Sequence, residues 1–181
     1  MKGIVFTLLQ QLVTDEYGED TWDALLDAAG VEGAYTSVAT YPDEEMVSLV
    51  SAAASALDKS PDEILIWFGR NCMPLFAERF PSVFTGHDNA RSLVLTLNDV
   101  IHPEVRKLFP GAYVPEFDFD DSDPEKLSLA YSSKRQLCSF AEGLLQGAAD
   151  HFRERATVVH ERCMKNGDER CLITCAFTPD R

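Results

Sequence analysis

Two hydroxyls and a guanidinium alternate along one short segment of the chain. Tyr131, Ser133 and Arg135 form a Y-x-S-x-R pattern at the end of a predicted strand. Because alternate side chains of an extended chain lie on one face, these three groups point the same way. The guanidinium offers paired, charge-assisted donors and the hydroxyls add further hydrogen bonds, which together suit carboxylates. The pattern predicts a site for a dianionic ligand, although the same residues are also common at the surface end of a strand.

A single histidine supplies the second chemical signal. His102 directly follows a stretch in which apolar residues recur at helical spacing, namely Leu93, Leu97, Val100 and Ile101. A lone histidine at such a place is usually a hydrogen-bonded or surface side chain, but an imidazole that faces an apolar cavity is the usual proximal ligand of haem iron. Together, His102 and the Y-x-S-x-R pattern describe one ligand, a flat macrocycle whose iron binds a nitrogen base and whose two propionates bind donors.

A third group of potential ligands lies near the end of the chain. It consists of His160, Cys163, Cys171 and Cys175. One imidazole and three thiolates are a tetrahedral zinc set, and a hairpin would bring its two halves together. Because the protein would fill all four positions, zinc here would be structural or linked to redox chemistry. Free thiols on a strand and a cysteine redox switch are the alternatives, and Cys138 is expected outside the group, in a packed helix.

The first half of the chain predicts a helical layer. Residues 4–80 contain helical patterns over 22–29 and 46–57, and Ser60 to Glu63 forms a capping box with Pro at the first helical position. A further helix is predicted from about Asn89 to Ile101, where it runs into His102-Pro103.

In the second half of the chain, the spacing of apolar residues changes from that of helices to that of strands in several segments. Strands are predicted over Val114–Phe119 and Lys126–Ser132, a helix over Leu137–Phe152, and a hairpin of Thr157–Met164 and Arg170–Phe177 around Asn-Gly. The chain is therefore predicted to be α+β, with an N-terminal helical subdomain and a C-terminal subdomain that combines a small antiparallel sheet with helices.

An excess of acidic residues limits the kinds of partner. The 181 residues include 16 Lys+Arg and 30 Asp+Glu, which gives a formal net charge of −14. Nucleic acids and anionic membranes attract basic surfaces, so neither is expected as a partner. Because a domain commonly has about 150 residues, residues 1–181 are predicted to form one domain, helical over about 1–80 and sheet-containing over about 81–181.

The number of cysteines and the motifs present further limit the kinds of protein that the chain could be. Five cysteines are too few for a disulfide scaffold, the first residues show no cleavage site, and no apolar stretch approaches the ~20 residues of a membrane span. We therefore expect a cytoplasmic protein. The sequence shows no nucleophile elbow and no phosphate-binding glycine loop, so an enzyme is not expected.

Several segments, taken in order, resemble the H-NOX (haem nitric oxide/oxygen binding) family over essentially the whole chain. They are Met1–Gly3, Gly18–Trp22, His102, Pro110–Ala112 with Pro115, and the Y-x-S-x-R pattern. The resemblance implies a ferrous b-type haem between the two subdomains, with His102 as its axial ligand. It also implies that Tyr131, Ser133 and Arg135 hold the propionates and that Pro115 lies against the haem. Some stand-alone bacterial members carry a similar His-Cys₃ zinc site.

The same resemblance also indicates which gases the haem would bind. Oxygen-binding members place a Tyr on the helix after the Y-x-S-x-R pattern, and the matching residue here is Phe140. Val5 and Leu9, at other distal positions, are also apolar, and Cys72 is expected near the distal face. Phe140 and Cys72 could equally be ordinary core residues. Since bound O₂ needs a hydrogen-bond donor and NO does not, we expect a sensor that binds NO, and also CO, but excludes O₂.

The resemblance implies a mechanism in which NO weakens or breaks the bond between His102 and iron. The helix of His102 would then shift and the subdomains rotate, which would regulate a separate protein, either a sensor histidine kinase or a cyclic-di-nucleotide enzyme. The alternative function is a zinc and thiol redox sensor that uses the C-terminal His-Cys₃ group. Haem-dependent catalysis is a third possibility, which the lack of a distal acid or base disfavours.

Overall fold

The computed structural model describes residues 1–180 and has an α+β fold. Its helices are α1 (Gly3–Tyr17), α2 (Glu19–Ala29), α3 (Asp43–Leu57), α4 (Pro61–Arg79), α5 (Pro81–Phe84), α6 (Ala90–Leu95), the π-helix η1 (Leu97–Ile101), α7 (His102–Leu108), α8 (Cys138–His151) and the 3₁₀-helix η2 (Met164–Asn166). Its strands are β1 (Glu116–Asp120), β2 (Leu127–Ser132), β3 (Glu154–Arg162) and β4 (Cys171–Pro179).

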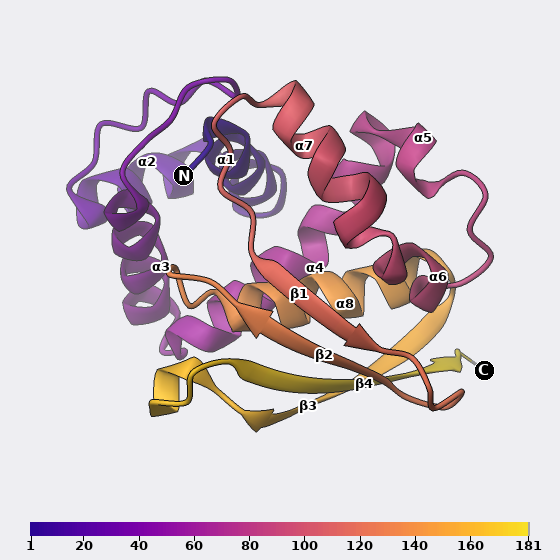
Figure 1. Cartoon of the computed structure of the whole chain (residues 1–181). Coiled ribbons are helices and arrows are strands. Elements are labelled where there is room, and N and C mark those ends of the chain that lie inside the picture. Colours follow the sequence, from indigo (N-terminus) through magenta and orange to yellow (C-terminus); the bar gives the residue numbers. More distant parts are fainter. Residues whose placement is uncertain (181) are drawn as a thin grey trace.

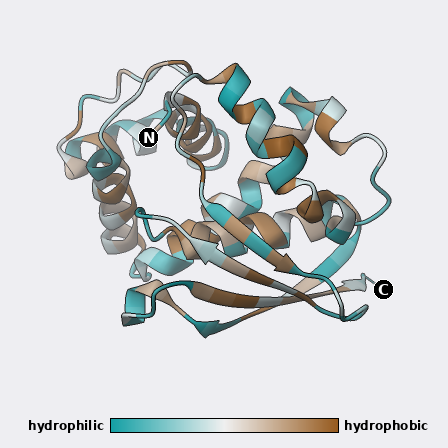
Figure 2. Cartoon of the chain, in the orientation of Figure 1, coloured by the Kyte–Doolittle hydropathy of each residue, from teal (hydrophilic) through white to brown (hydrophobic). Residues whose placement is uncertain are grey.

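The four strands form one antiparallel sheet in the order β1-β2-β4-β3. Along β2 and β4 every second residue is buried, so one face of the sheet packs against the protein interior. Helix α8 lies across this face, and α4 packs against α8 on the side away from the sheet (Figure 1). Hydrophobic stretches along α1, α4 and α8 meet at the centre of the molecule (Figure 2).

Two glycines allow α4 and α8 to cross closely. A Cβ on Gly69 would lie 2.3 Å from the Phe140 carbonyl oxygen, and a Cβ on Gly143 would lie 2.2 Å from the Ile66 carbonyl oxygen. Any side chain at either glycine would therefore force the helices apart. This contact fixes the turn of α8 that carries Phe140.

The helix start predicted from the capping box at Ser60–Glu63 is confirmed. The Ser60 hydroxyl accepts a hydrogen bond from the Glu63 amide at 3.2 Å, and the Glu63 carboxylate accepts one from the Ser60 amide at 2.8 Å, with Pro61 in the first turn of α4. At α6, the Asn89 side chain accepts a hydrogen bond from the Ser92 amide at 2.8 Å.

The helix predicted from Asn89 does not end at His102-Pro103. It passes through α6 and the π-helical turn η1, and then continues as α7, of which His102 is the first residue. The backbone amide of His102 bonds to the Leu97 carbonyl, as in a π-helix. Pro103 is tolerated because it stands in the first turn of α7, where its missing N–H leaves no hydrogen bond unmade.

None of the helices between residues 1 and 180 combines the length and the apolarity that crossing a bilayer requires.

Candidate functional site

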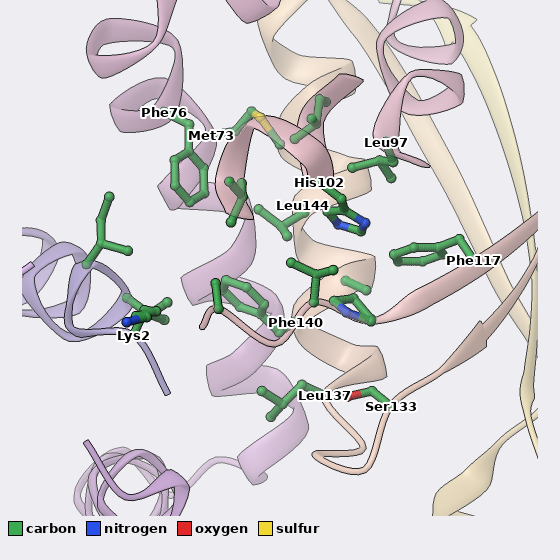
Figure 3. Close-up of a pocket in the computed structure, with 18 of the residues that line it drawn as sticks. Lys2, Met73, Phe76, Leu97, His102, Phe117, Ser133, Leu137, Phe140 and Leu144 are labelled. Atoms are coloured by element: carbon green, nitrogen blue, oxygen red, sulfur yellow. The ribbon is translucent and has the colours of Figure 1, made fainter. Parts of the chain in front are cut away.

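An apolar cavity of about 350 Å³ opens at the centre of the molecule. Side chains from α1, α4, α7, β1 and α8 converge on it (Figure 3). Its apolar lining includes Ile4, Val5, Met73, Phe76, Val94, Leu97, Ile101, Pro115, Phe117, Leu137, Phe140 and Leu144. The volume falls in the range of cavities that hold a cofactor or a small ligand.

His102 lines this cavity and is 9% exposed. Its ring lies beside that of Phe117, with 5.9 Å between the ring centroids. Burial, with a smaller contribution from the charge of Arg106, lowers the pKa of His102 to about 4. The imidazole is therefore neutral at physiological pH, which is the form that coordinates a metal.

The three residues of the Y-x-S-x-R pattern line the same cavity. Tyr131 and Ser133 are almost fully buried, and the Arg135 side chain is 16% exposed. The Tyr131 hydroxyl accepts a hydrogen bond from the Leu137 amide at 3.1 Å, and the Ser133 hydroxyl accepts one from the Arg135 amide at 3.2 Å. Burial raises the pKa of Tyr131 to about 12, so its hydroxyl keeps a proton that it can donate to an anion.

Asp43 and Tyr113 hold the Arg135 guanidinium, and neither was singled out in the sequence. Arg135 Nε donates to Asp43 Oδ2 at 2.8 Å, and Arg135 Nη1 donates to the Tyr113 carbonyl at 3.0 Å. The guanidinium carbon lies 4.8 Å from the centroid of the Tyr113 ring. Asp43 could have been noticed only as an acidic residue in the first turn of a helix, which is a common stabilising position.

Asp43 also pairs with the amino group of Met1, at 2.6 Å from Oδ1. Burial opposes ionisation of Asp43, but the hydrogen bonds and charges of Arg135 and of this amino group outweigh it and lower the pKa of the carboxyl. Asp43 therefore remains ionised and joins α3 to the segment after β2.

The other predicted pocket residues divide into two groups. Val5, Pro115 and Phe140 line the cavity, and Phe140 packs on Phe68 with 4.9 Å between ring centroids. Leu9 and Cys72 are buried in the neighbouring helical core and are not among the residues that line the cavity. Lys2 and Glu104 also reach its lining, as polar residues that sequence reasoning did not consider.

A group of three cysteines forms a second candidate site. The sulfurs of Cys138, Cys163 and Cys171 all lie within 4.8 Å of one another, with 3.6 Å between Cys138 and Cys163 and 3.9 Å between Cys171 and Cys163. This corrects the expected ligand set, because Cys138 takes the place assigned to Cys175. Cys175 lies four positions after Cys171 along β4, which is ~13 Å in a strand, so both thiols cannot reach one ion.

His160 lies next to the three cysteines. Hydrogen bonds with Cys138 and with Glu142 raise the pKa of His160 to about 10, and its Nε2 lies 3.0 Å from Glu142 Oε2. That nitrogen is buried beside the Glu142 carboxylate. His160 therefore adjoins the cysteine group through Cys138, and an imidazole beside thiols is the kind of donor set that zinc prefers.

An ion pair and a hydrogen bond join the hairpin that carries two of these cysteines to helices α4 and α8. Lys165, in η2, forms an ion pair with Asp62 at the start of α4 and donates to the Ser139 hydroxyl at 3.0 Å. The cysteine group therefore lies where β3, β4, α4 and α8 meet.

Comparisons with known proteins agree with this geometry. The family described as Haem-NO-binding matches residues 2–160. A crystal structure of an H-NOX protein from S. oneidensis in the Fe(II)NO state is 33% identical, with a TM-score of 0.92 over 98% of this chain and 99% of that one. Unliganded Fe(II) H-NOX from K. algicida is 27% identical, with a TM-score of 0.87 and coverage of 98% and 97%.

A solution structure of IWP-051-bound H-NOX from Shewanella woodyi in the Fe(II)CO state is 32% identical, with a TM-score of 0.82 and coverage of 97% and 94%. No match was found among curated proteins.

Proposed function

This chain belongs to the haem-NO-binding (H-NOX) family, and we propose that it is a nitric oxide sensor whose b-type haem is held by His102. One observation carries the proposal: a buried, neutral histidine and a buried tyrosine, serine and arginine set open into the same apolar cavity. These are the donors that a haem requires, one nitrogen for its iron and several hydrogen bonds for its two propionates.

The residues of the cavity have separate tasks. Ferrous haem, when bound, supplies the iron that binds NO. His102, at the start of α7, would hold that iron, Tyr131 and Ser133 would donate to the propionates, and Arg135 would neutralise their charge. Pro115 would contact the macrocycle. The apolar lining excludes bulk water, so each of these polar contacts acts in a low-dielectric environment.

The apolar lining also decides which diatomic ligand stays bound. Val5, Phe140 and Leu144 offer no hydrogen-bond donor, and Phe140 is held in place by Phe68. Because bound O₂ depends on a donor and NO does not, this lining favours NO and CO over O₂. Similar H-NOX proteins have been solved in the Fe(II)NO and Fe(II)CO states, which supports both ligands.

Signalling follows from the position of His102. It stands at the junction of η1 and α7, so a change at the iron that it would hold could be passed directly to α7. The protein thereby regulates a separate partner in the cytoplasm, a sensor histidine kinase or a cyclic-di-nucleotide enzyme, and works as one domain without catalytic turnover.

The absorption spectrum of the reduced protein under argon, with and without NO, tests the proposal. We expect a haem spectrum that shifts on NO addition and is unchanged on exposure to O₂. His102→Ala is the matched variant, and it should lose haem unless imidazole is supplied. Full haem binding by His102→Ala without imidazole would reject the ligand assignment.

The cysteine group supports a second candidate function, a zinc and thiol redox sensor. Cys138, Cys163, Cys171 and His160 would hold zinc, and oxidation of the thiols would expel it. The backbone amide of Lys165, the neighbouring thiols and His160 together outweigh burial and lower the pKa of Cys163, which favours its thiolate.

Elemental analysis of single cysteine variants tests this second function. Cys163→Ser should lose zinc, and the matched variant Cys175→Ser should keep it, because Cys175 is buried in β4 away from the group. Equal zinc content in both variants would overturn the corrected ligand set.

A further inference from the structure

A second cavity, polar and of about 320 Å³, adjoins the apolar one. It is lined by Asn98, His102, Arg106, Pro115, Glu116, Phe117, Asp118 and Arg170. Three of these residues, His102, Pro115 and Phe117, line both cavities. The imidazole of His102 is therefore part of a wall with an apolar cavity on one side and a polar cavity on the other.

The polar cavity is built on the helical segment that carries the histidine. Asn98, His102 and Arg106 follow one another at intervals of four residues across η1 and α7, which places them along one side of that segment. Asn98 Nδ2 donates to the Phe117 carbonyl at 2.7 Å, so η1 is fastened to β1 beside the histidine. Arg106 is exposed and brings a positive charge to the opening.

If one ring nitrogen of His102 binds iron, the other can form a hydrogen bond on the side of the polar cavity. A metal-bound histidine usually donates its second ring N–H to a carboxylate, a carbonyl or water. Within residues 1–180 the His102 ring makes no hydrogen bond to the protein, and neither of its nitrogens is a fully buried orphan. On the side of the polar cavity, near the Arg170–Asp118 ion pair at 2.6 Å, a water molecule could accept this hydrogen bond.

We propose that the polar cavity receives the imidazole of His102 when its bond to iron breaks. The inference rests on the haem ligation proposed above. An imidazole released into the apolar cavity would leave a polar nitrogen unpaired among hydrocarbon side chains, which is unfavourable. By turning into the polar cavity, the ring exchanges its bond to iron for hydrogen bonds with solvent. The polar cavity thus lowers the free energy of the released state.

The backbone at this point permits the movement. The amide of His102 bonds to the Leu97 carbonyl in the π-helical pattern, and π-helical turns often lie at functional sites of helices. Conversion of η1 to an α-helical pattern would rotate the residues that follow it, including His102, relative to β1.

A double variant with an apolar lining, Asn98→Leu/Arg106→Leu, tests the proposal. After NO addition to the reduced haem protein, the nitrogen hyperfine pattern in the electron paramagnetic resonance spectrum reports whether histidine remains on the iron. We expect the ratio of released to bound histidine to fall by about tenfold in the apolar variant, the fold-change that corresponds to loss of one hydrogen bond by the released ring.

Two controls make the result specific. Asn98→Ser/Arg106→Lys loses the same Asn98–Phe117 hydrogen bond but keeps the lining polar, so it should release histidine more readily than the apolar variant. Lys107→Leu removes the adjacent positive charge outside both cavities and should have no effect. The iron–histidine stretch in the resonance Raman spectrum of the reduced protein, before NO is added, verifies that every variant starts with His102 bound.

The outcomes separate this inference from the proposed function. Release in the apolar variant equal to that in the natural protein overturns the inference, and so does an equal fall in the apolar and the polar double variants. If the natural protein binds no haem, or keeps its histidine on the iron with NO present, the proposed function fails instead.

Discussion

At the scale of single residues, polar and apolar side chains line different parts of the cavity. The polar groups that would hold a cofactor come from His102 and from the segment 131–135, whereas the wall formed by Val5, Phe140 and Leu144 is hydrocarbon. A donor placed in that wall would face the ligand directly. In the proposed function, selectivity between NO and O₂ would therefore be set by single side chains.

Phe140→Tyr should add a hydrogen-bond donor to the apolar wall. The new hydroxyl stabilises bound O₂ by one hydrogen bond, which corresponds to roughly a tenfold gain in O₂ affinity. Titration of the reduced protein with O₂, followed by absorption, measures the change. Phe76→Tyr, on α4 at another part of the lining, is the comparison variant. Unchanged O₂ affinity in Phe140→Tyr would show that residue 140 does not face the ligand.

Asp43→Asn should weaken the binding of the haem propionates by Arg135. Without the carboxylate, the Arg135 guanidinium loses its ion pair at 2.8 Å and is held only by the Tyr113 carbonyl and ring. We expect haem to leave roughly tenfold faster, measured as transfer to an excess of apomyoglobin. Glu44→Gln removes one charge at the next, exposed residue and should have no effect. Equal rates in both variants would exclude Asp43 from the propionate site.

The same ion pair predicts a pH dependence. Because the pKa of Asp43 is lowered in the folded protein, its contribution to stability is present above the unfolded carboxyl pKa and is lost as pH falls through the lowered value. Haem retention should therefore be constant near neutrality and should fall in acid. In Asp43→Asn the acid-dependent part of this loss should be smaller, and identical pH profiles would contradict the role of the carboxylate.

At the scale of elements, local sequence predicted what depends on local chemistry. The capping box at Ser60–Glu63 begins α4, and the predicted strands, α8 and the terminal hairpin all exist within a few residues of their expected bounds. The π-helical turn at Leu97–Ile101 was missed, because its apolar spacing does not differ from that of an α-helix. Cys138 was excluded from the thiol group because only the packing of α8 on β4 brings it there.

Gly143→Ala should test the crossing of α4 and α8. The new Cβ would lie 2.2 Å from the Ile66 carbonyl, so the helices must separate, at a cost of ~1–3 kcal/mol in free energy of unfolding. Denaturant unfolding measures the loss. Ser51→Ala, at an exposed position of α3, should lose far less. A similar stability for Gly143→Ala and the natural protein would mean that the helices can move apart at little cost.

At the scale of the whole molecule, the apolar cavity joins the helical layer to the sheet-containing part. Side chains from α1 and α4 meet those from α7, β1 and α8 around it, so a ligand that fills it contacts both. The charge of −14 opposes compaction, and burial of apolar surface around a bound ligand offsets that repulsion. Three ion pairs also link the same two parts, namely Asp43 with Arg135, Asp62 with Lys165 and Arg70 with Asp150.

Removal of haem should therefore lower the stability of the entire domain. A ligand present at ~1,000 times its dissociation constant adds about 4 kcal/mol, which corresponds to a rise of roughly 10 °C in Tm for a chain of this length. Differential scanning calorimetry of the haem-free and haem-loaded protein measures the difference. His102→Ala loaded with haem and imidazole is the control, and it should recover most of the gain because the macrocycle still fills the cavity. Equal Tm values with and without haem would mean that the cavity closes when empty, and that the two parts of the fold hold together without a ligand between them.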